Sequence, residues 1–162
     1  MARQHKKTGS KSSSNKSSDL PYEVDMTKTA ELVYMNLARL SKAAESAGDY
    51  VNAHCTTFHM VQDAIKRIIP SDPLNKGHAL RGDLSNIFRL RKGRLRICWI
   101  ASSQMRRVCI LFISESLRKE GDANDPYAIF KSLLDSGMFD TMIKSYGVRI
   151  PLRLPGKSAR PN

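Results

Sequence analysis

The 162-residue sequence has no long apolar run and few cysteines. No stretch approaches the roughly 18 apolar residues that a membrane-spanning helix needs, and residues 1–18 carry no apolar segment typical of secretory signals. The three cysteines, Cys55, Cys98 and Cys109, have no short metal-binding spacing, and an odd number cannot all pair with one another. These absences exclude an integral membrane protein, and we expect a reduced, cytoplasmic protein of one domain.

The motifs of common catalytic machineries are also absent. The sequence has no complete P-loop, no G-x-S-x-G nucleophile elbow and no H-E-x-x-H zinc motif. His54 and His59 lie five positions apart on a predicted helix, which points their side chains in different directions. We therefore expect no metal ion and no other cofactor.

What the sequence has in excess is positive charge. Lys and Arg number 27 against 15 Asp and Glu, which gives a formal net charge of +12. Residues 1–18 carry +5, residues 147–162 carry +4, and the segment 81–107 carries +7 with Asp83 as its single acid. The basic residues of this central segment are Arg81, Arg89, Arg91, Lys92, Arg94, Arg96, Arg106 and Arg107. Such a concentration is typical of a face that binds a polyanion, although a solvated arginine-rich hairpin has the same composition.

The composition divides the chain into a body and two tails. Residues 1–24 form a basic Ser/Lys-rich stretch with too little apolar area to offset the entropy of ordering, so we expect it to be disordered. Residues 147–162 form a second basic tail, in which Pro151 rules out a central strand. The folded domain is expected over residues 25–146.

Two amphipathic helices are predicted at the start of the domain. Asp25 is a suitable N-cap for a helix that reaches about Ala47. Its apolar residues at helical intervals are Leu32, Met35, Leu37 and Leu40. A second helix is predicted over about residues 50–69, where Pro70 ends it. Because the link between them is short, the two helices should form an antiparallel hairpin.

Three short strands and a last helix follow. The strands are predicted over residues 86–91, 94–101 and 107–114. The third is apolar at nearly every position, as expected for a strand covered on both faces. Asp125 as N-cap, Pro126 in the first turn and Gly137 just past the end mark the helix. The predicted fold is α+β, with an N-terminal helical hairpin packed on a small antiparallel sheet and a C-terminal helix.

Alternation along the first two strands sorts their side chains onto two faces. Residues two apart share a face, so Arg89 lies with Arg91. By the same rule Arg94 lies with Arg96, and the sheet should have one apolar face and one arginine-lined face over these strands. Trp99 should point to the apolar face. The residues expected to border the arginine-lined face are Arg118, Lys119 and Tyr127.

The run from Ala79 to Ile97, ALRGDLSNIFRLRKGRLRI, resembles the central signature of RelE-superfamily toxins of bacterial toxin–antitoxin pairs. The Leu117-Arg118 step and the segment DPYAIFKSLLDSG, which ends at Gly137, are similar to the YhaV-type branch. The resemblance spans about residues 28–137 and leaves both basic tails outside. One departure is Ile87, where relatives often carry a further Lys or Arg.

The resemblance implies a metal-independent endoribonuclease that cleaves mRNA on the ribosome, neutralised by a PrlF-like antitoxin of the swapped-hairpin type. The catalytic residues that it implies are Arg89, Arg96, Arg118 and Tyr127. The RNA-binding residues expected beside them are Arg81, Arg91, Arg94 and Lys119. These residue types suit cleavage by the RNA's own 2′-OH, because guanidinium groups bind phosphate bidentately and stay charged.

Two other functions remain open at this level. ParE-like toxins, which poison gyrase, share the Leu-Arg-Gly and strand signature, but they need neither Tyr127 nor a phosphate-binding arginine pair. A non-catalytic RNA- or DNA-binding module would also use a basic face, and it would show steep salt dependence without cleavage. Arg118 and the last helix, with Tyr127 in its first turn, favour the nuclease.

Overall fold

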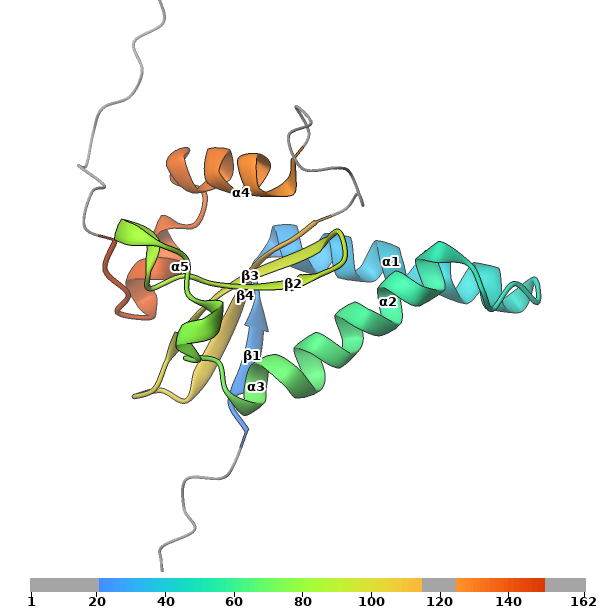
Figure 1. The fold of residues 1–162 in the computed structure, drawn as a ribbon, viewed down its shortest axis with the longest axis horizontal. Helices are drawn as coiled ribbons and strands as arrows, with labels where there is room; N and C mark the ends of the chain where they lie inside the picture. The colour runs from blue at the N-terminus through green and yellow to red at the C-terminus, as the bar shows by residue number, and fades with distance from the viewer. Residues whose placement is uncertain (1–20, 115–124, 151–162) are drawn as a thin grey trace, which may run out of the picture.

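The computed structural model describes residues 21–114 and 125–150, which form a four-stranded sheet between two layers of helices (Figure 1). The strands are β1 (Glu23–Met26), β2 (Phe88–Lys92), β3 (Leu95–Ser102) and β4 (Arg107–Ile113). The helices are α1 (Lys28–Ser46), α2 (Ala53–Asp63), α3 (Ile69–Ser71), α4 (Pro126–Asp135) and α5 (Asp140–Ser145). The predicted α+β class is confirmed. None of the helices in these ranges is long and apolar enough to cross a membrane.

The sheet is mixed, with the strand order β1-β4-β3-β2. Strand β1 runs parallel to β4, with Glu23 opposite Arg107 and Met26 opposite Ile110. The prediction of a wholly antiparallel sheet is therefore wrong. It missed β1 because the strand is short and its acidic residues alternate with only two apolar ones, beside a stretch rich in Ser and Lys. The strand begins two residues before the predicted start of the domain.

Helix α1 begins later than predicted because a different residue caps it. Thr27 is the N-cap, and its hydroxyl oxygen accepts a hydrogen bond from the Ala30 amide at 3.2 Å. The same hydroxyl donates to the carbonyl of Leu111 in β4 at 2.8 Å. Asp25, the predicted cap, lies in β1 instead. The cap thus fixes the start of α1 against the middle of the sheet.

The buried face of α1 agrees with the predicted one at Leu37 but not at Leu32 and Met35. Its buried residues are Ala30, Val33, Leu37 and Ser41. Leu32 and Met35 are 57% and 58% exposed. Small side chains at Ala30 and Ser41 allow close packing, so the contact face of the helix is not the one with the largest apolar residues.

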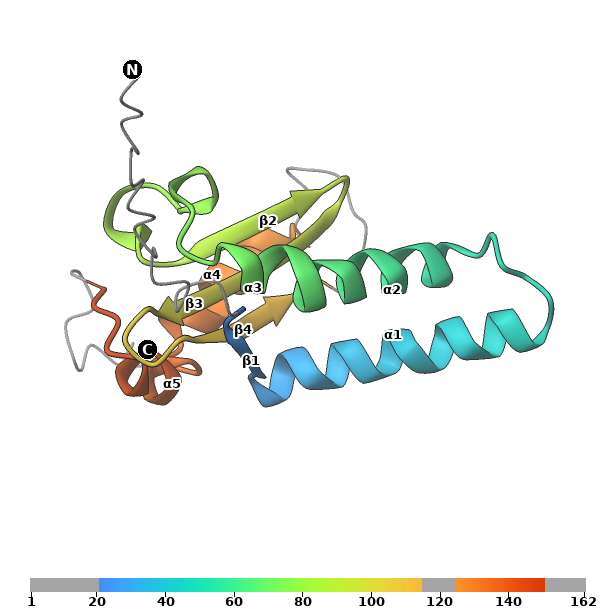
Figure 2. The same ribbon diagram turned by 90° about the horizontal axis from the view of Figure 1, so that it is seen from below.

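Helix α2 begins at Ala53, after an N-cap at Asn52 whose side chain accepts from the His54 amide at 2.9 Å. The predicted start at Tyr50 is therefore three residues too early. The helix continues as a π-helical turn over Ala64–Ile68 and then as α3, so it passes Pro70 by one residue. α1 and α2 pack against each other and run in opposite directions beneath the sheet (Figure 2).

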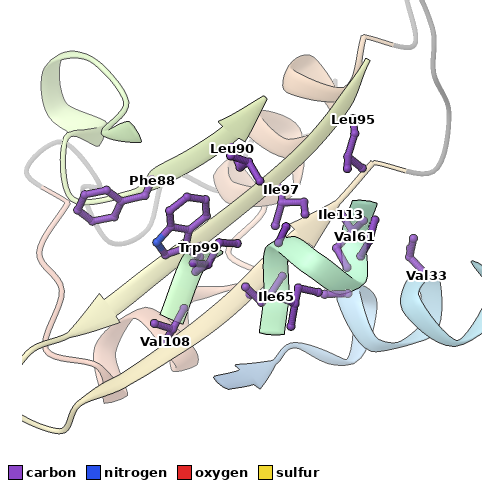
Figure 3. Packing of buried hydrophobic residues seen from close by; sticks show 14 of the residues in the cluster. Val33, Val61, Ile65, Phe88, Leu90, Leu95, Ile97, Trp99, Val108 and Ile113 are labelled. Atoms are coloured by element: carbon purple, nitrogen blue, oxygen red, sulfur yellow. The ribbon is translucent and has the colours of Figure 1, made fainter. Parts of the chain in front are cut away.

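Two hydrophobic cores lie on the two faces of the sheet. The first packs α1 and α2 against side chains such as Leu90, Ile97 and Trp99, which point toward Val61 and Ile65 (Figure 3). Trp99 is a core residue, as predicted, and its indole nitrogen donates to the Pro73 carbonyl at 2.9 Å. The second core packs α4 and α5 against the other face. β4 contributes to both cores, so the prediction of a strand covered on both faces is confirmed.

Candidate nucleic-acid interface

Three of the predicted arginines share the face of the sheet that carries α4. Arg89 and Arg91 alternate along β2 with Leu90, which belongs to the core beneath α1 and α2. In the antiparallel register of β2 and β3, Arg91 lies opposite Arg96 and Arg89 lies opposite Cys98. The arginine-lined face therefore exists, but it occupies only the hairpin end of the two strands. From Cys98 to Ala101, β3 is buried on both faces.

Arg94 lies in the turn between the strands rather than on β3. Lys92 pairs with Leu95, which leaves a two-residue loop of Gly93 and Arg94. Gly93 adopts a positive φ of 55°, which a tight hairpin turn requires and which a residue without a Cβ adopts readily. The prediction that Arg94 shares a strand face with Arg96 is wrong for this reason. Arg94 is exposed at the tip of the same hairpin.

Arg96 is held by several contacts at the start of β3. Its Nη1 donates to the carbonyls of Gly93 at 2.7 Å and Leu95 at 2.9 Å. Its backbone amide donates to Ser114 Oγ at 2.9 Å, and the Ser114 amide donates to the Arg96 carbonyl at 2.9 Å. Ser114 is buried at the end of β4. Sequence reasoning missed this serine, although a lone polar residue closing an apolar strand was a usable signal.

Arg89 and Tyr127 meet although 38 positions separate them. The guanidinium carbon of Arg89 lies 5.6 Å from the centroid of the Tyr127 ring, within the range of a cation–π interaction. Tyr127 is in the first turn of α4, and the buried side chains of Phe130 and Leu134 hold this helix on the second core. Two predicted catalytic residues are thus brought together by packing of the last helix on the sheet.

Cys98 lies between the charges of Arg89 and Arg96. Burial raises the pKa of its thiol to about 12, although both guanidinium groups act to lower it. The thiol is therefore uncharged at neutral pH and does not neutralise either arginine.

The other basic residues of the segment 81–107 are distributed around the fold. Arg81 is exposed and precedes the turn Gly82–Leu84. Arg106 and Arg107 lie at the opposite end of β3 from Arg96. Arg107 donates to both carboxylate oxygens of Asp25, at 2.9 and 2.7 Å, and Arg106 stacks on Tyr22 at 4.8 Å. The basic segment 81–107 therefore contributes charge at both ends of β3, one near the β2–β3 turn and the other near the β3–β4 turn.

Two of the predicted residues cannot be placed on this surface. Arg118 and Lys119 lie outside the described residues. Ile87, the departure from the family pattern, is fully buried in the second core, so in this chain the position contributes to packing. Across residues 21–114 and 125–150, no three His, Cys, Asp or Glu side chains come close enough together to hold a metal ion.

Residues 25–146 match the family model of the YhaV toxins, described as toxins with endonuclease activity of toxin–antitoxin systems. The chain is a member of the YhaV toxin family. The predicted family is thereby confirmed, and so is its coarse function, an endonuclease toxin of a toxin–antitoxin system. No curated protein matches the chain.

Two solved structures of toxins are similar to this YhaV-family chain. One belongs to the toxin–antitoxin complex RelBE2 of Mycobacterium tuberculosis, with 22% identity and a TM-score of 0.44, over 61% of this chain and 95% of that chain. The other is the isolated RelE toxin of E. coli, with 12% identity and a TM-score of 0.44, over 71% of this chain and 97% of that chain.

Proposed function

We propose that this YhaV-family toxin is an endoribonuclease that cleaves mRNA on the ribosome and so inhibits translation. The observation that carries the proposal is the contact between Arg89 and Tyr127, beside the facing pair Arg91 and Arg96. Guanidinium groups stay charged at neutral pH and bind phosphate oxygens bidentately. The surface therefore suits an RNA backbone better than a neutral ligand.

The RNA supplies its own nucleophile in this reaction. The 2′-OH attacks the adjacent phosphorus, the bond to the 5′-oxygen breaks, and the products are a 2′,3′-cyclic phosphate and a 5′-OH end. The protein has to align the attack, stabilise negative charge on the phosphorane and transfer protons. A nuclease of this kind requires no metal ion and no other cofactor.

Each arginine has a distinct role in the proposal. Arg96 and Arg118 bind the scissile phosphate, and Arg89 stabilises the charge that develops on it or protonates the leaving oxygen. Tyr127 acts through its ring, which holds the Arg89 guanidinium and offers a face to a splayed base. Four further basic residues bind the flanking RNA: Arg81, Arg91, Arg94 and Lys119.

The partner in the cell is an antitoxin, which we propose to be PrlF-like and of the swapped-hairpin type. A toxin that acts on mRNA and ribosomes works in the cytoplasm. By covering the basic hairpin of β2 and β3, the antitoxin would block RNA from the site. By displacing α4, it would separate Arg89 from Tyr127. Either action prevents the proposed cleavage.

The experiment is primer extension on a reporter transcript after brief expression of the full chain, with growth followed in parallel. New RNA 5′ ends that require translation and disappear in Arg96→Ala and Arg118→Ala variants are the expected result. A matched Arg39→Ala variant on α1, where Arg39 is exposed, should cleave like the wild type. Growth arrest with intact RNA would overturn the proposal in favour of gyrase poisoning, which a supercoiling assay detects. RNA binding without cleavage or arrest would overturn it in favour of a binding module.

A further inference from the structure

A groove of about 560 Å³ lies at the end of the sheet farthest from the β2–β3 turn at Gly93 and Arg94. Its floor includes Phe88, at the start of β2, and Ala101, near the end of β3. The other lining residues come from two further segments, with Leu74 and Lys76 in one and Tyr146, Gly147, Val148 and Arg149 in the other. The groove is therefore built from parts of the chain that are distant in sequence, around an apolar floor.

The charge of the groove has one sign. Lys76 and Arg149 are both exposed and line it, and no carboxylate is among the lining residues. The neutral polar residues that line it are Asn86, Ser102 and Ser103. Cations and hydroxyl or amide groups above an apolar floor match the chemistry of a nucleotide, which has an anionic phosphate and a flat base.

The shape of the groove does not depend on the side chain of Arg149. The Asn86 side-chain amide donates to the backbone carbonyl of Arg149 at 2.8 Å and so ties the segment before β2 to the segment after α5. The Leu80 amide donates to the Ile87 carbonyl at 2.8 Å, which fixes the chain on both sides of Asn86. These contacts use the backbone carbonyls of Arg149 and Ile87. Removing the Arg149 guanidinium should therefore leave the residues that line the groove in place.

The groove is next to the proposed catalytic surface along β2. Phe88 in its floor directly precedes Arg89, and successive side chains of a strand point to opposite faces. β2 is the last strand of the sheet in the described residues. A single RNA strand that crosses the edge of β2 could therefore contact Arg89 on one face of the sheet. On the other face it could enter the groove at the start of β2.

We infer that this groove binds a nucleotide of single-stranded RNA flanking the cleaved phosphate, with Lys76 and Arg149 on its backbone. The inference rests on the proposed function and extends it, because it assigns a second binding position for the same substrate. A base lying on Phe88 and Ala101, near the Asn86 amide and two serines, contributes to the choice of cleavage site. Ser102 and Ser103 give the groove hydroxyl groups that distinguish one base edge from another.

The test compares a Lys76→Ala/Arg149→Ala variant with an Arg39→Ala/Lys42→Ala control, which removes the same charges from exposed positions on α1. Binding of a fluorescent 2′-O-methyl RNA strand, which lacks the attacking hydroxyl, is measured over a range of salt concentrations. The groove variant should bind several-fold more weakly than the control, with a salt slope lower by about 0.7 for each lost cation. Primer extension should show a broader choice of bases beside the cut.

Equal affinity, salt slope and cleavage pattern in the two double variants would overturn the groove assignment while leaving the proposed nuclease intact. A wild-type chain that cleaves no RNA would overturn the proposed function, whereas the binding measurement would still decide whether the groove holds RNA. An Arg149→Glu variant provides a second reading, because the Asn86 contact uses only the carbonyl of Arg149. It should bind more weakly than Arg149→Ala, and equal binding by the two would contradict the inference.

Discussion

At the scale of single residues, the contact between Arg89 and Tyr127 joins the sheet to the last helix at the proposed site. Both side chains are half-buried, so the ring and the guanidinium interact in partial shelter from water. A cation–π contact of this kind contributes about 0.5–2 kcal/mol. In the proposed reaction, the contact holds the Arg89 guanidinium where negative charge develops on the phosphorane.

This role predicts different results for two substitutions of Tyr127. Tyr127→Phe keeps the ring and should retain nearly all of the cleavage rate, whereas Tyr127→Ala should slow cleavage by about 2- to 30-fold, as the loss of about 0.5–2 kcal/mol of cation–π interaction implies. Single-turnover cleavage of a reporter RNA measures both. If the Phe variant is as slow as the Ala variant, the hydroxyl rather than the ring is used.

Arg96 gives a second prediction at this scale. Arg96→Ala should lower the cleavage rate by about 10²–10³, the usual cost of removing one charge-stabilising group. Arg96→Lys keeps the charge but loses the planar fork, so it should recover only part of the rate. The same single-turnover assay compares the two. Full activity of the Lys variant would show that charge alone is needed.

At the scale of elements, the position of α4 decides whether Tyr127 reaches the sheet. Phe130 fixes this helix, because its ring lies 5.7 Å from that of Phe112 and 5.9 Å from that of Phe139. Phe130 is fully buried, whereas its neighbour Ile129 is 39% exposed. The helix is therefore held by its buried residues Phe130 and Leu134 rather than by Ile129.

Phe130→Ala should lower the free energy of unfolding by about 3–5 kcal/mol, because it removes a buried aromatic side chain and leaves a cavity. Cleavage should fall with it, since Tyr127 loses its support. Ile129→Ala is the control, and it should change stability far less. Urea denaturation followed by tryptophan fluorescence measures both variants. Equal destabilisation by the two would contradict the assigned packing of α4.

The elements also indicate how far the sequence could predict this fold. The strands of the hairpin, the last helix and the buried Trp99 follow from local alternation and turn residues, and they lie within a few residues of their predicted places. The N-cap at Thr27 could not be predicted in this way, because its second partner, the Leu111 carbonyl, lies 84 positions away. The parallel pairing of β1 is likewise a contact between distant segments.

The candidate site was predictable to a similar degree. Alternation placed Arg89, Arg91 and Arg96 on one face, and the structure agrees. The proximity of Arg89 to Tyr127 depends on how α4 packs, which no local pattern encodes. The basic segment 81–107 also includes Arg107, which binds Asp25 at the other end of the sheet.

At the scale of the whole molecule, a network around Asp25 connects β1, β4 and the residue after α5. Arg107 donates to both oxygens of this carboxylate, and the Tyr146 hydroxyl donates to it at 2.5 Å. Hydrogen bonds from Arg107 hold the pKa of Asp25 below its usual 3.8, despite partial burial. The pKa of Tyr146 is raised by burial and by its bond to this carboxylate, so the phenol stays protonated.

The lowered pKa of Asp25 predicts the pH dependence of this network. A carboxylate that binds protons less tightly when folded stabilises the fold above pH 3.8, and the contribution is lost as the pH falls through the lower folded pKa. Asp25→Asn should therefore cost about 1–2 kcal/mol at pH 7. The difference from the wild type should shrink below pH 3.8, as measured by chemical denaturation. A difference that stays constant with pH would contradict the ionic role of Asp25.

In the proposed reaction, the arginine surface of β2 and β3 promotes attack by the RNA's own 2′-OH on the adjacent phosphorus. The most direct measurement is cleavage of a reporter mRNA on translating ribosomes, in which one nucleotide, immediately 5′ of the cut phosphate, carries 2′-deoxyribose. Cleavage at that phosphate should stop, while the unmodified RNA should yield a 2′,3′-cyclic phosphate end. Continued cleavage at the modified position would contradict the proposed reaction, because another nucleophile would then be attacking the phosphorus.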